Sequence, residues 1–352
     1  MARLRPLAKA VSVLTTPLTP EDFLGLINPL SSRRQLRGIV TEVIAETADS
    51  ATIRFRPGKG WQAHRAGQWA RIGVEIDGVR HWRSYSLTTA AGQDPAITVT
   101  AIGKVSTALV HGTKVGDVLF LAPPQGDFVL PEHPRPLLMI TAGSGLTPVM
   151  SMIRTLVERR ADADVVLLHS ARTREDSLFT AELAELTAAH PGLRVVHWFT
   201  GERGRRLDLA HPGDLDDLCP DWRTRAAYVC GPADMLDAAT ALWHEHHDPD
   251  ELTIERFAPV IAAGAGGSGG LITFEKSDKE FDADGETTLL EAGEDAGVVM
   301  PSGCRMGICH TCVTRLISGQ VRDLRTGEIH GDDGQAVQTC VSVAAGPVHL
   351  DI

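Results

Sequence analysis

Long apolar segments are absent from this chain of 352 residues. No uninterrupted apolar run approaches the roughly 18 to 20 residues that cross a membrane as a helix. The first residues, Met1-Ala2-Arg3-Leu4-Arg5, are followed by neither an apolar core nor a small-residue cleavage site, so the pattern of a secretory signal is missing too. We therefore expect a cytoplasmic protein without a transmembrane segment.

Basic residues are scarce at one end of the chain and acidic residues at the other. The stretch from Leu271 to Ile352 has 14 Asp and Glu against 6 Lys and Arg, whereas Met1 to Gly38 has 2 against 6. An acidic end and a basic end on one chain argue against nucleic-acid binding and favour docking on polar partners. Ordinary solvation explains the same charges equally well.

Cysteine is rare outside the last 49 residues, which hold four of the six. In a cytosolic chain this clustering favours a metal site over disulfides. The spacing C-x4-C-x2-C with a distant fourth cysteine is that of plant-type [2Fe-2S] clusters, whereas zinc sites usually have a second C-x2-C pair, which is missing here. Gly303 and Gly307 let such a loop turn around a cluster. The predicted cluster ligands are Cys304, Cys309, Cys312 and Cys340.

The pattern of apolar residues divides the chain into unlike parts. Residues 1–36 have turn residues without a clean period, which we interpret as an extension that packs on another surface. Residues 37–133 show short alternating runs separated by Gly and Asp, which predict an antiparallel barrel. Residues 134–258 alternate continuous apolar runs with helical segments, which predict a doubly wound parallel sheet.

A Gly-rich stretch separates these parts from the cysteine-rich end. Residues 259–270 include the sequence AAGAGGSGG, which has the composition of a flexible linker; a long surface loop is the alternative. The remaining residues, 271–352, form the third predicted domain.

Two short motifs lie in the predicted barrel. The sequence RSYSLT at 83–88 follows a strand, and GKVST at 103–107 opens a helix whose N-terminal amides can cradle a pyrophosphate. Taken alone, the first motif is equally explained as an ordinary strand end.

A third motif opens the first helix of the predicted parallel sheet. In GSGLTP at 143–148, the glycines let the backbone approach a pyrophosphate at a helix N-terminus. The third glycine of the usual dinucleotide fingerprint is absent. After the next strand, Ser170, Arg172 and Arg174 could hold a 2′-phosphate, and no Asp or Glu is present there to bind a free ribose.

Together these motifs resemble the ferredoxin–NADP reductase superfamily. The motifs R-x-Y-S, G-x-x-S, G-x-G-x-x-P and a later C-G-P, at Cys230-Gly231-Pro232, occur in the order found in that family, and the resemblance covers residues 37–352. The resemblance implies a six-stranded antiparallel β-barrel that binds FAD, an α/β doubly wound nucleotide domain and a β-grasp ferredoxin domain.

The resemblance also implies roles for single residues. Arg83 would pair with a flavin phosphate, Tyr85 would pack against the flavin, and the Ser86 hydroxyl would reach its N5 atom. Cys230 would lie near the reactive nicotinamide carbon and Phe257 would cover the flavin, although a core role explains either residue. The predicted catalytic residues are Ser86 and Cys230.

The full set of predicted cofactor contacts follows from the same motifs. Those for the flavin are Arg83, Ser84, Tyr85, Ser86, Leu87, Thr88, Gly103, Lys104, Val105, Ser106, Thr107 and Phe257. Those for the nucleotide are Gly143, Ser144, Gly145, Thr147, Pro148, Ser170, Arg172, Arg174, Cys230, Gly231 and Pro232. Two phosphate-binding segments favour FAD over FMN, and the arginines favour NADPH over NADH.

This order of domains predicts an electron path from NAD(P)H through FAD to the cluster and on to a protein acceptor. Similar reductases serve oxygenases, membrane desaturases and hydroxylases, and the extension, with Thr16-Pro17-Leu18, resembles the partner of bacterial acyl-CoA desaturases. A membrane di-iron fatty acyl-CoA desaturase is therefore the first predicted acceptor, reached by peripheral contact through the extension. A Rieske or alkane hydroxylase, or a role as stand-alone carrier or sensor, is the alternative. Arg305, Met306 and Ile308 are predicted acceptor contacts.

Overall fold

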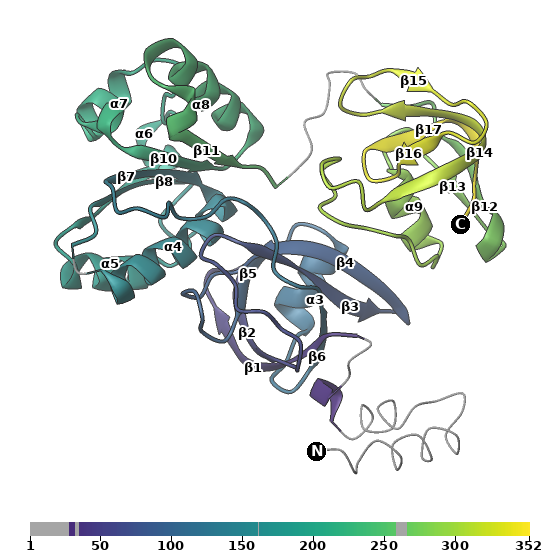
Figure 1. The fold of residues 1–352 in the computed structure, drawn as a ribbon, viewed down its shortest axis with the longest axis horizontal. Helices are drawn as coiled ribbons and strands as arrows, with labels where there is room; N and C mark the ends of the chain where they lie inside the picture. Colours follow the sequence, from purple (N-terminus) through teal and green to yellow (C-terminus); the bar gives the residue numbers. More distant parts are fainter. Residues whose placement is uncertain (1–27, 32–34, 161, 258–265) are drawn as a thin grey trace, which may run out of the picture.

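The computed structural model describes residues 28–31, 35–160, 162–257 and 266–352. Most of the predicted extension and part of the predicted linker lie outside these residues. Three sheets follow one another along the described chain (Figure 1). Among the described residues, no helix is long and apolar enough to cross a membrane.

The first sheet is antiparallel and has six strands in the order β4-β3-β6-β1-β2-β5. An isolated bridge between Leu87 and Ile97 joins its two ends and closes it into a barrel. Helix α3 contributes Val105 and Leu109 to the apolar interior. Its elements are η1 (Pro29–Ser31), β1 (Arg37–Ala45), β2 (Ser50–Pro57), β3 (Trp69–Ile76), β4 (Val79–Ser86), β5 (Ala96–Thr100), α3 (Lys104–Gly112) and β6 (Val118–Leu121).

The second sheet is parallel, with five strands in the order β11-β10-β7-β8-β9. Its strands are β7 (Leu137–Ala142), β8 (Val165–Ala171), β9 (Leu193–Phe199), β10 (Ala226–Cys230) and β11 (Leu252–Glu255). The helical segments between and beside them are η2 (Gly143–Gly145), α4 (Leu146–Arg159), α5 (Thr180–Ala189), α6 (Thr200–Arg203), α7 (Gly213–Leu218), η3 (Trp222–Thr224), α8 (Ala233–His246) and η4 (Pro249–Glu251).

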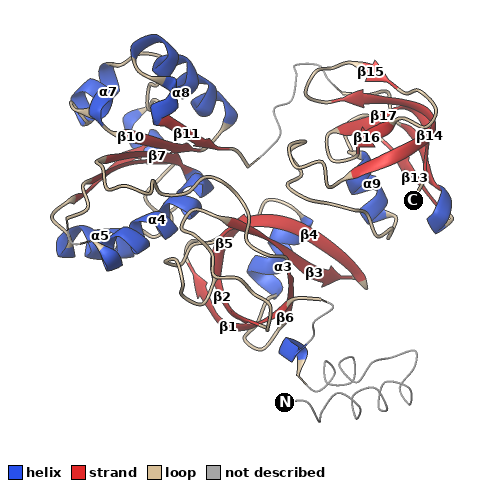
Figure 2. Ribbon diagram, in the orientation of Figure 1, coloured by secondary structure: helices blue, strands red, loops and turns tan. Residues whose placement is uncertain are grey.

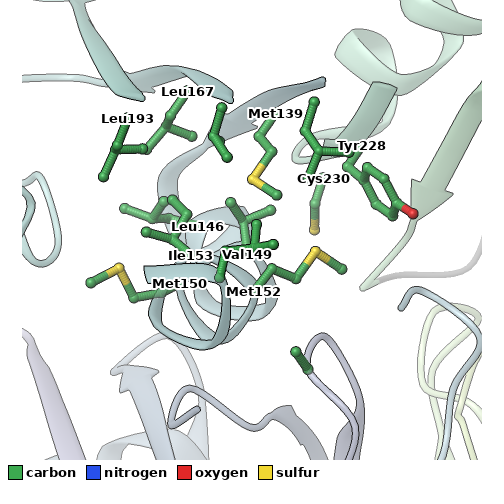
Figure 3. Packing of buried hydrophobic residues seen from close by; sticks show 14 of the residues in the cluster. Met139, Leu146, Val149, Met150, Met152, Ile153, Leu167, Leu193, Tyr228 and Cys230 are labelled. Atoms are coloured by element: carbon green, nitrogen blue, oxygen red, sulfur yellow. The ribbon is translucent and has the colours of Figure 1, made fainter. Parts of the chain in front are cut away.

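Both faces of this parallel sheet are covered, which explains its continuous apolar strands. In β7, Leu137 and Met139 join one core with residues of α4, while Leu138 and Ile140 join a second core with residues of α8. Figure 3 shows the first core, where Met139 lies above the α4 side chains. The predicted doubly wound arrangement is confirmed.

The third sheet has the order β13-β12-β17-β14-β15, and β16 pairs with β14 (Figure 2). Strands β12 and β17 run parallel, and helix α9 packs its Leu289 and Leu290 into the core of this sheet. The elements are β12 (Gly270–Phe274), η5 (Glu275–Ser277), β13 (Lys279–Ala283), α9 (Leu289–Asp295), β14 (Val313–Asp323), β15 (Ile329–His330), β16 (Ala336–Gln338) and β17 (Ser342–Leu350).

The last glycines of the predicted linker 259–270 belong to this third sheet. The Gly267 amide donates to the Gly285 carbonyl at 2.6 Å, and the Gly269 amide donates to the Ala344 carbonyl at 3.2 Å. Gly270 pairs with Ala283 as the first residue of β12. Composition suggested a flexible segment here, but backbone pairing, which composition does not reveal, fixes these residues.

Candidate functional site

A cavity of about 430 Å³ lies where the three sheets meet. Its wall combines residues from β4, from the start of α3, from the loop before α4 and from the segment after β11. Cys304 and Met306 of the cysteine-rich loop complete the wall. Motifs that are far apart in the sequence thus face one common space.

Strand β4 supplies one side of this cavity through residues 83–86. Tyr85 is partly buried, and burial raises its pKa to about 12, so the phenol stays neutral. The Arg83 guanidinium, expected to pair with a phosphate, donates to Glu294 of α9 at 3.0 Å. A guanidinium has five donors, so this pairing leaves others for a phosphate.

Helix α3 supplies another side through Gly103, Lys104, Val105 and Ser106. The Ser106 hydroxyl accepts from the amides of Ile102 and Gly103, each at 3.0 Å. Because the hydroxyl caps the helix, Ser106 orders the loop and leaves Lys104 and the helix N-terminus to face an anion.

Three of the predicted flavin contacts do not line the cavity. Leu87 is fully buried in the core of the barrel. Thr88 is also fully buried, and its carbonyl accepts from Arg154 of α4. Thr107 is exposed one turn into α3. The structure therefore gives the first two a packing role, because strand β4 ends at Ser86 and the chain then turns inwards.

A second cavity, of about 570 Å³, lies at the carboxyl ends of the parallel strands, where open α/β sheets bind nucleotides. It is lined by five of the residues that the sequence predicts as nucleotide contacts: Gly143, Ser144, Ser170, Arg172 and Pro232. Arg206, from the segment after α6, lines it as well and pairs with Asp234. The sequence interpretation missed Arg206 because no motif marks it.

Arg174 does not reach this cavity. Its guanidinium lies 4.9 Å from the centre of the Phe199 ring and borders a different groove, beside α5. Arg172 and Arg174, predicted together as phosphate contacts, therefore border different spaces, because the chain turns between them and the two side chains separate.

The glycine-rich loop before α4 is shaped by close backbone contact. A Cβ atom on Gly145 would lie 2.1 Å from the Cys230 carbonyl oxygen, so a larger residue would push the loop away from β10. Thr147 donates to the Ser144 carbonyl at 2.8 Å and lines the first cavity. Pro148 is buried in the first turn of α4, where a proline is tolerated.

Cys230 is fully buried in the core between the sheet and α4 (Figure 3). Burial and the nearby Glu255 raise the pKa of its thiol well above the ordinary value. Cys230 therefore remains a neutral thiol, and it lines neither cavity. The structure favours a packing role, with contact to a nicotinamide possible only through movement of its neighbours.

Glu255, at the end of β11, lines the first cavity and was not among the predicted site residues. Burial, reinforced by Asp127, raises its pKa from 4.5 to about 7. Its signal in the sequence was its place two residues before Phe257, which is exposed and lines the same cavity. A carboxyl poised near neutral pH can hold or release a proton beside the predicted flavin.

The four predicted cluster ligands lie together in two pairs. The Cys304 and Cys309 amides donate to the Cys309 and Cys304 sulfurs at 3.1 and 3.4 Å, and the Cys312 and Cys340 sulfurs lie 3.2 Å apart. The Cys340 thiol lowers the pKa of Cys312 by hydrogen bonding to it. Burial alone would raise the pKa of Cys309, but hydrogen bonds from Thr311 and the Cys304 amide lower it.

These thiols fit a two-iron cluster better than a single ion. Among the described residues, no group of three or more His, Cys, Asp or Glu side chains is placed to hold one metal ion. Two pairs of sulfurs, with amides directed at them, are what two bridged irons need. A Cβ atom on Gly303 would lie 2.2 Å from the Cys309 sulfur, so only glycine lets the loop close this tightly.

The loop residues expected to contact an acceptor point in different directions. The Arg305 side chain is 14% exposed and donates to Glu294, and Met306 faces the first cavity. Ile308 is 67% exposed. Only Ile308 of the three is available on the outside, because the loop curls over the cysteines and turns its first half towards the barrel.

Comparisons with known proteins agree with this geometry. Residues 139–241 match the family model described as an oxidoreductase NAD-binding domain, and residues 272–345 match the 2Fe-2S iron-sulfur cluster binding domain. An NADPH oxidoreductase of Mycobacterium tuberculosis is 50% identical over 355 residues, which cover 98% of this chain and 92% of that protein.

Two further relatives are more distant. The glycine betaine monooxygenase reductase subunit of Pseudomonas aeruginosa is 27% identical and is covered over 99% of its length, with 93% of this chain. The structure of phthalate dioxygenase reductase superposes with a TM-score of 0.68 at 22% identity, covering 90% of this chain and 97% of that one. The latter likeness shows a shared fold.

The chain belongs to the ferredoxin–NADP reductase-like oxidoreductases that carry a NAD-binding domain and a C-terminal [2Fe-2S] ferredoxin domain. It is an NAD(P)H oxidoreductase with a flavin and a [2Fe-2S] cluster as cofactors, as the sequence predicted.

Proposed function

We propose that this protein takes electrons from NADPH, passes them through FAD and the [2Fe-2S] cluster, and delivers them to a protein acceptor. One observation carries the proposal: residues of the flavin motif, of the nucleotide loop and of the cluster loop line a single cavity. When bound, the flavin takes two electrons from NADPH as a hydride and releases them one at a time, which matches the single electron that the cluster accepts.

Different residues around the cavity would bind the phosphates and the ring of the flavin. Arg83, Lys104 and the N-terminus of α3 supply positive charge for the flavin phosphates, and Tyr85 supplies a neutral aromatic surface for its ring. Two separate phosphate contacts favour FAD over FMN. Ser86 and Glu255 are the polar groups that can exchange protons near the ring.

The nucleotide cavity favours NADPH over NADH. Arg172 and Arg206, the latter paired with Asp234, bring two guanidinium groups to the same cavity, which Ser170 also lines. A 2′-phosphate can bind such a pair through charge-assisted hydrogen bonds, whereas a free ribose gains little from it. The relative from Mycobacterium tuberculosis is itself named an NADPH oxidoreductase.

The acceptor we propose is a membrane di-iron fatty acyl-CoA desaturase. Support comes from the resemblance of the extension at residues 1–36, most of which lies outside the described residues. The acceptor would bring this otherwise cytoplasmic reductase to the membrane. The second candidate is a Rieske or other oxygenase, which the name of the Pseudomonas aeruginosa relative, a monooxygenase reductase subunit, favours.

Reconstitution decides between these acceptors. NADPH and this protein would be combined with an acyl-CoA desaturase in vesicles and, separately, with a Rieske oxygenase. Desaturated product only in the first mixture supports the first proposal, and turnover of the oxygenase alone refutes it. In parallel, the visible flavin and cluster bands should bleach faster with NADPH than with NADH.

A further inference from the structure

Glu294 of α9 connects the ferredoxin domain to the barrel through one carboxylate oxygen and binds the cluster loop of its own domain through the other. Oε2 accepts from Arg83 Nη1 at 3.0 Å, and Oε1 accepts from Arg305 Nη2. Glu294 is only 4% exposed, so water screens these contacts little. One buried carboxylate thus pairs with two arginines from different domains.

Each of the two arginines lies beside one of the two proposed redox sites. Arg83 belongs to the R-x-Y-S motif and lines the flavin cavity. Arg305 directly follows Cys304, and its backbone φ of 61° lies in the left-handed region, which non-glycine residues rarely adopt. This unusual backbone directs Arg305 towards Glu294 and leaves Cys304 and Met306 facing the cavity.

Without the carboxylate, the two guanidinium groups would face one another. Both positive charges lie near the Tyr85 phenol. Each of them lowers the pKa of Tyr85 and so offsets part of the rise that burial causes. Breaking a buried ion pair by removing one partner is far more costly than the pair is worth, because the remaining charge is left uncompensated. Here Arg305 would lose its ion pair, and Arg83 would keep only the longer contact with Glu291, at 3.9 Å.

A second contact joins the same two domains nearby. The Arg71 side chain donates to the backbone carbonyl of Ser302, two residues before Cys304. This contact does not involve the Glu294 side chain, so it survives any substitution at Glu294. Loss of Glu294 should therefore loosen the docking of the cluster loop without detaching it.

We propose that Glu294 is a positioning residue that holds the cluster loop against the flavin cavity and thereby sets the rate of electron transfer from flavin to cluster. The inference rests on the proposed function of the cavity. It assigns Glu294 no part in hydride transfer from NADPH, since Glu294 lines neither the flavin cavity nor the nucleotide cavity.

The test uses the full chain loaded with both cofactors, mixed with NADPH in an anaerobic stopped-flow instrument. In Glu294→Gln, flavin bleaching should keep the wild-type rate, and bleaching of the cluster bands should slow by about tenfold. Asp295→Asn is the matched control, because it removes the same charge from the exposed neighbouring position of the helix. The control should leave both phases unchanged.

A second readout does not depend on activity. Hydrogen exchange of the amides in β4 and α9 should rise together in Glu294→Gln, while exchange in the parallel sheet stays as in the wild type. If the wild type itself shows no bleaching with NADPH, the proposed function fails, and hydrogen exchange still tests the docking contact.

Three outcomes overturn the inference. The first is a cluster phase in Glu294→Gln within twofold of the wild type, and the second is an equal slowing of both phases. If Glu294→Gln fails to load its cofactors, Arg305→Gln replaces it and should show the same selective slowing. The third outcome concerns Arg305→Gln. A cluster phase at the wild-type rate in this variant overturns the inference. Failure of this variant to bind its cofactors overturns it as well, because the contact then has a purely structural role.

Discussion

The barrel meets its two neighbours through contacts of different kinds. On the side of the parallel sheet, one face of α4 binds the backbone of the loop after β4: Ser151 donates to the Thr89 carbonyl at 2.6 Å, and the Ala91 amide donates to Thr155 at 2.9 Å. On the side of the ferredoxin domain, the contacts rest on arginines, and the pairing of Arg83 with Glu294 joins two charged side chains.

The difference teaches how each junction responds to change. Hydrogen bonds to backbone groups depend on the shape of the loop and little on its side chains, so the junction with the parallel sheet behaves as part of one core. Contacts between charged side chains need every partner and depend strongly on burial. Hydride transfer is thus served by a junction that rests mainly on hydrogen bonds to backbone groups, which we call the fixed junction, and electron transfer to the cluster by a junction that includes a pair of charged side chains.

Substitution of Cys304 by serine should have the largest effect, and it should separate the step at the cluster from the step at the flavin. The cluster needs four thiolates, so Cys304→Ser should reduce electron delivery to an acceptor by on the order of 100-fold. Flavin bleaching by NADPH should stay within about twofold, since the fixed junction is untouched. Stopped-flow absorbance and acceptor assays measure the two steps, and an acceptor rate that survives would remove the cluster from the path.

The fixed junction itself can be weakened at Arg154. Its side chain, 17% exposed, pairs with Glu182 at 2.5 Å and donates to the Thr88 carbonyl. Arg154→Ala should lower the free energy of opening this junction by about 1–3 kcal/mol, because charge-assisted bonds between partly buried groups are lost. Hydrogen exchange of α4 measures the effect. The exposed Arg159, which donates to the Ala91 carbonyl, gives the control Arg159→Ala, for which a change below about 0.5 kcal/mol is expected.

The carboxyl at the meeting point of both junctions should make stability depend on pH. The pKa of Glu255 is raised from 4.5 to about 7 in the folded protein, so the folded state holds the proton more tightly than the unfolded state. Its contribution is fully present below pH 4.5 and is lost as pH rises towards 7, by up to about 2–3 kcal/mol. Urea unfolding at pH 5 and pH 8 should show this loss in the wild type and a smaller loss in Glu255→Gln. Equal losses in both proteins would contradict the assignment.

The smallest effect is expected at the nucleotide cavity. Arg172→Ala should raise the KM for NADPH by about five- to tenfold, with little change for NADH, because a bound 2′-phosphate would lose one guanidinium. Arg174→Ala is a natural control, since Arg174 lies against Phe199 outside this cavity. If the two variants behave alike, the selectivity comes from elsewhere.

Most of the fold and the cofactors could be predicted from the spacing of residues within short motifs. Cys304, Cys309 and Cys312 share one short loop, and GSGLTP joins one strand to the next helix, so their neighbours are set by the chain itself. The same holds for the first two sheets, because apolar periodicity reports which faces of a strand are covered, whereas the β-grasp fold of the third followed from the family resemblance.

Contacts between distant residues were beyond such reasoning. The partner of Arg83 is 211 positions away in the sequence, and nothing local to Arg83 or Glu294 links them. The raised pKa of Glu255 depends on burial beside Asp127, which the sequence does not encode as a motif. Arg172 and Arg174 differ by two positions and face different spaces, because the chain turns after β8 ends at Ala171.

The glycines that precede β12 bear on how the ferredoxin domain could be prepared alone. A fragment cut at Leu271, where the sequence pattern places the boundary, would lose the amides of Gly267 and Gly269 and the carbonyl of Gly269. The carbonyls of Gly285 and Ala344 and the amide of Gly346 would then be left without their partners at the edge of the sheet. A fragment that begins at or before Gly267 would keep all three hydrogen bonds and should be the more stable starting point for spectroscopy of the isolated cluster.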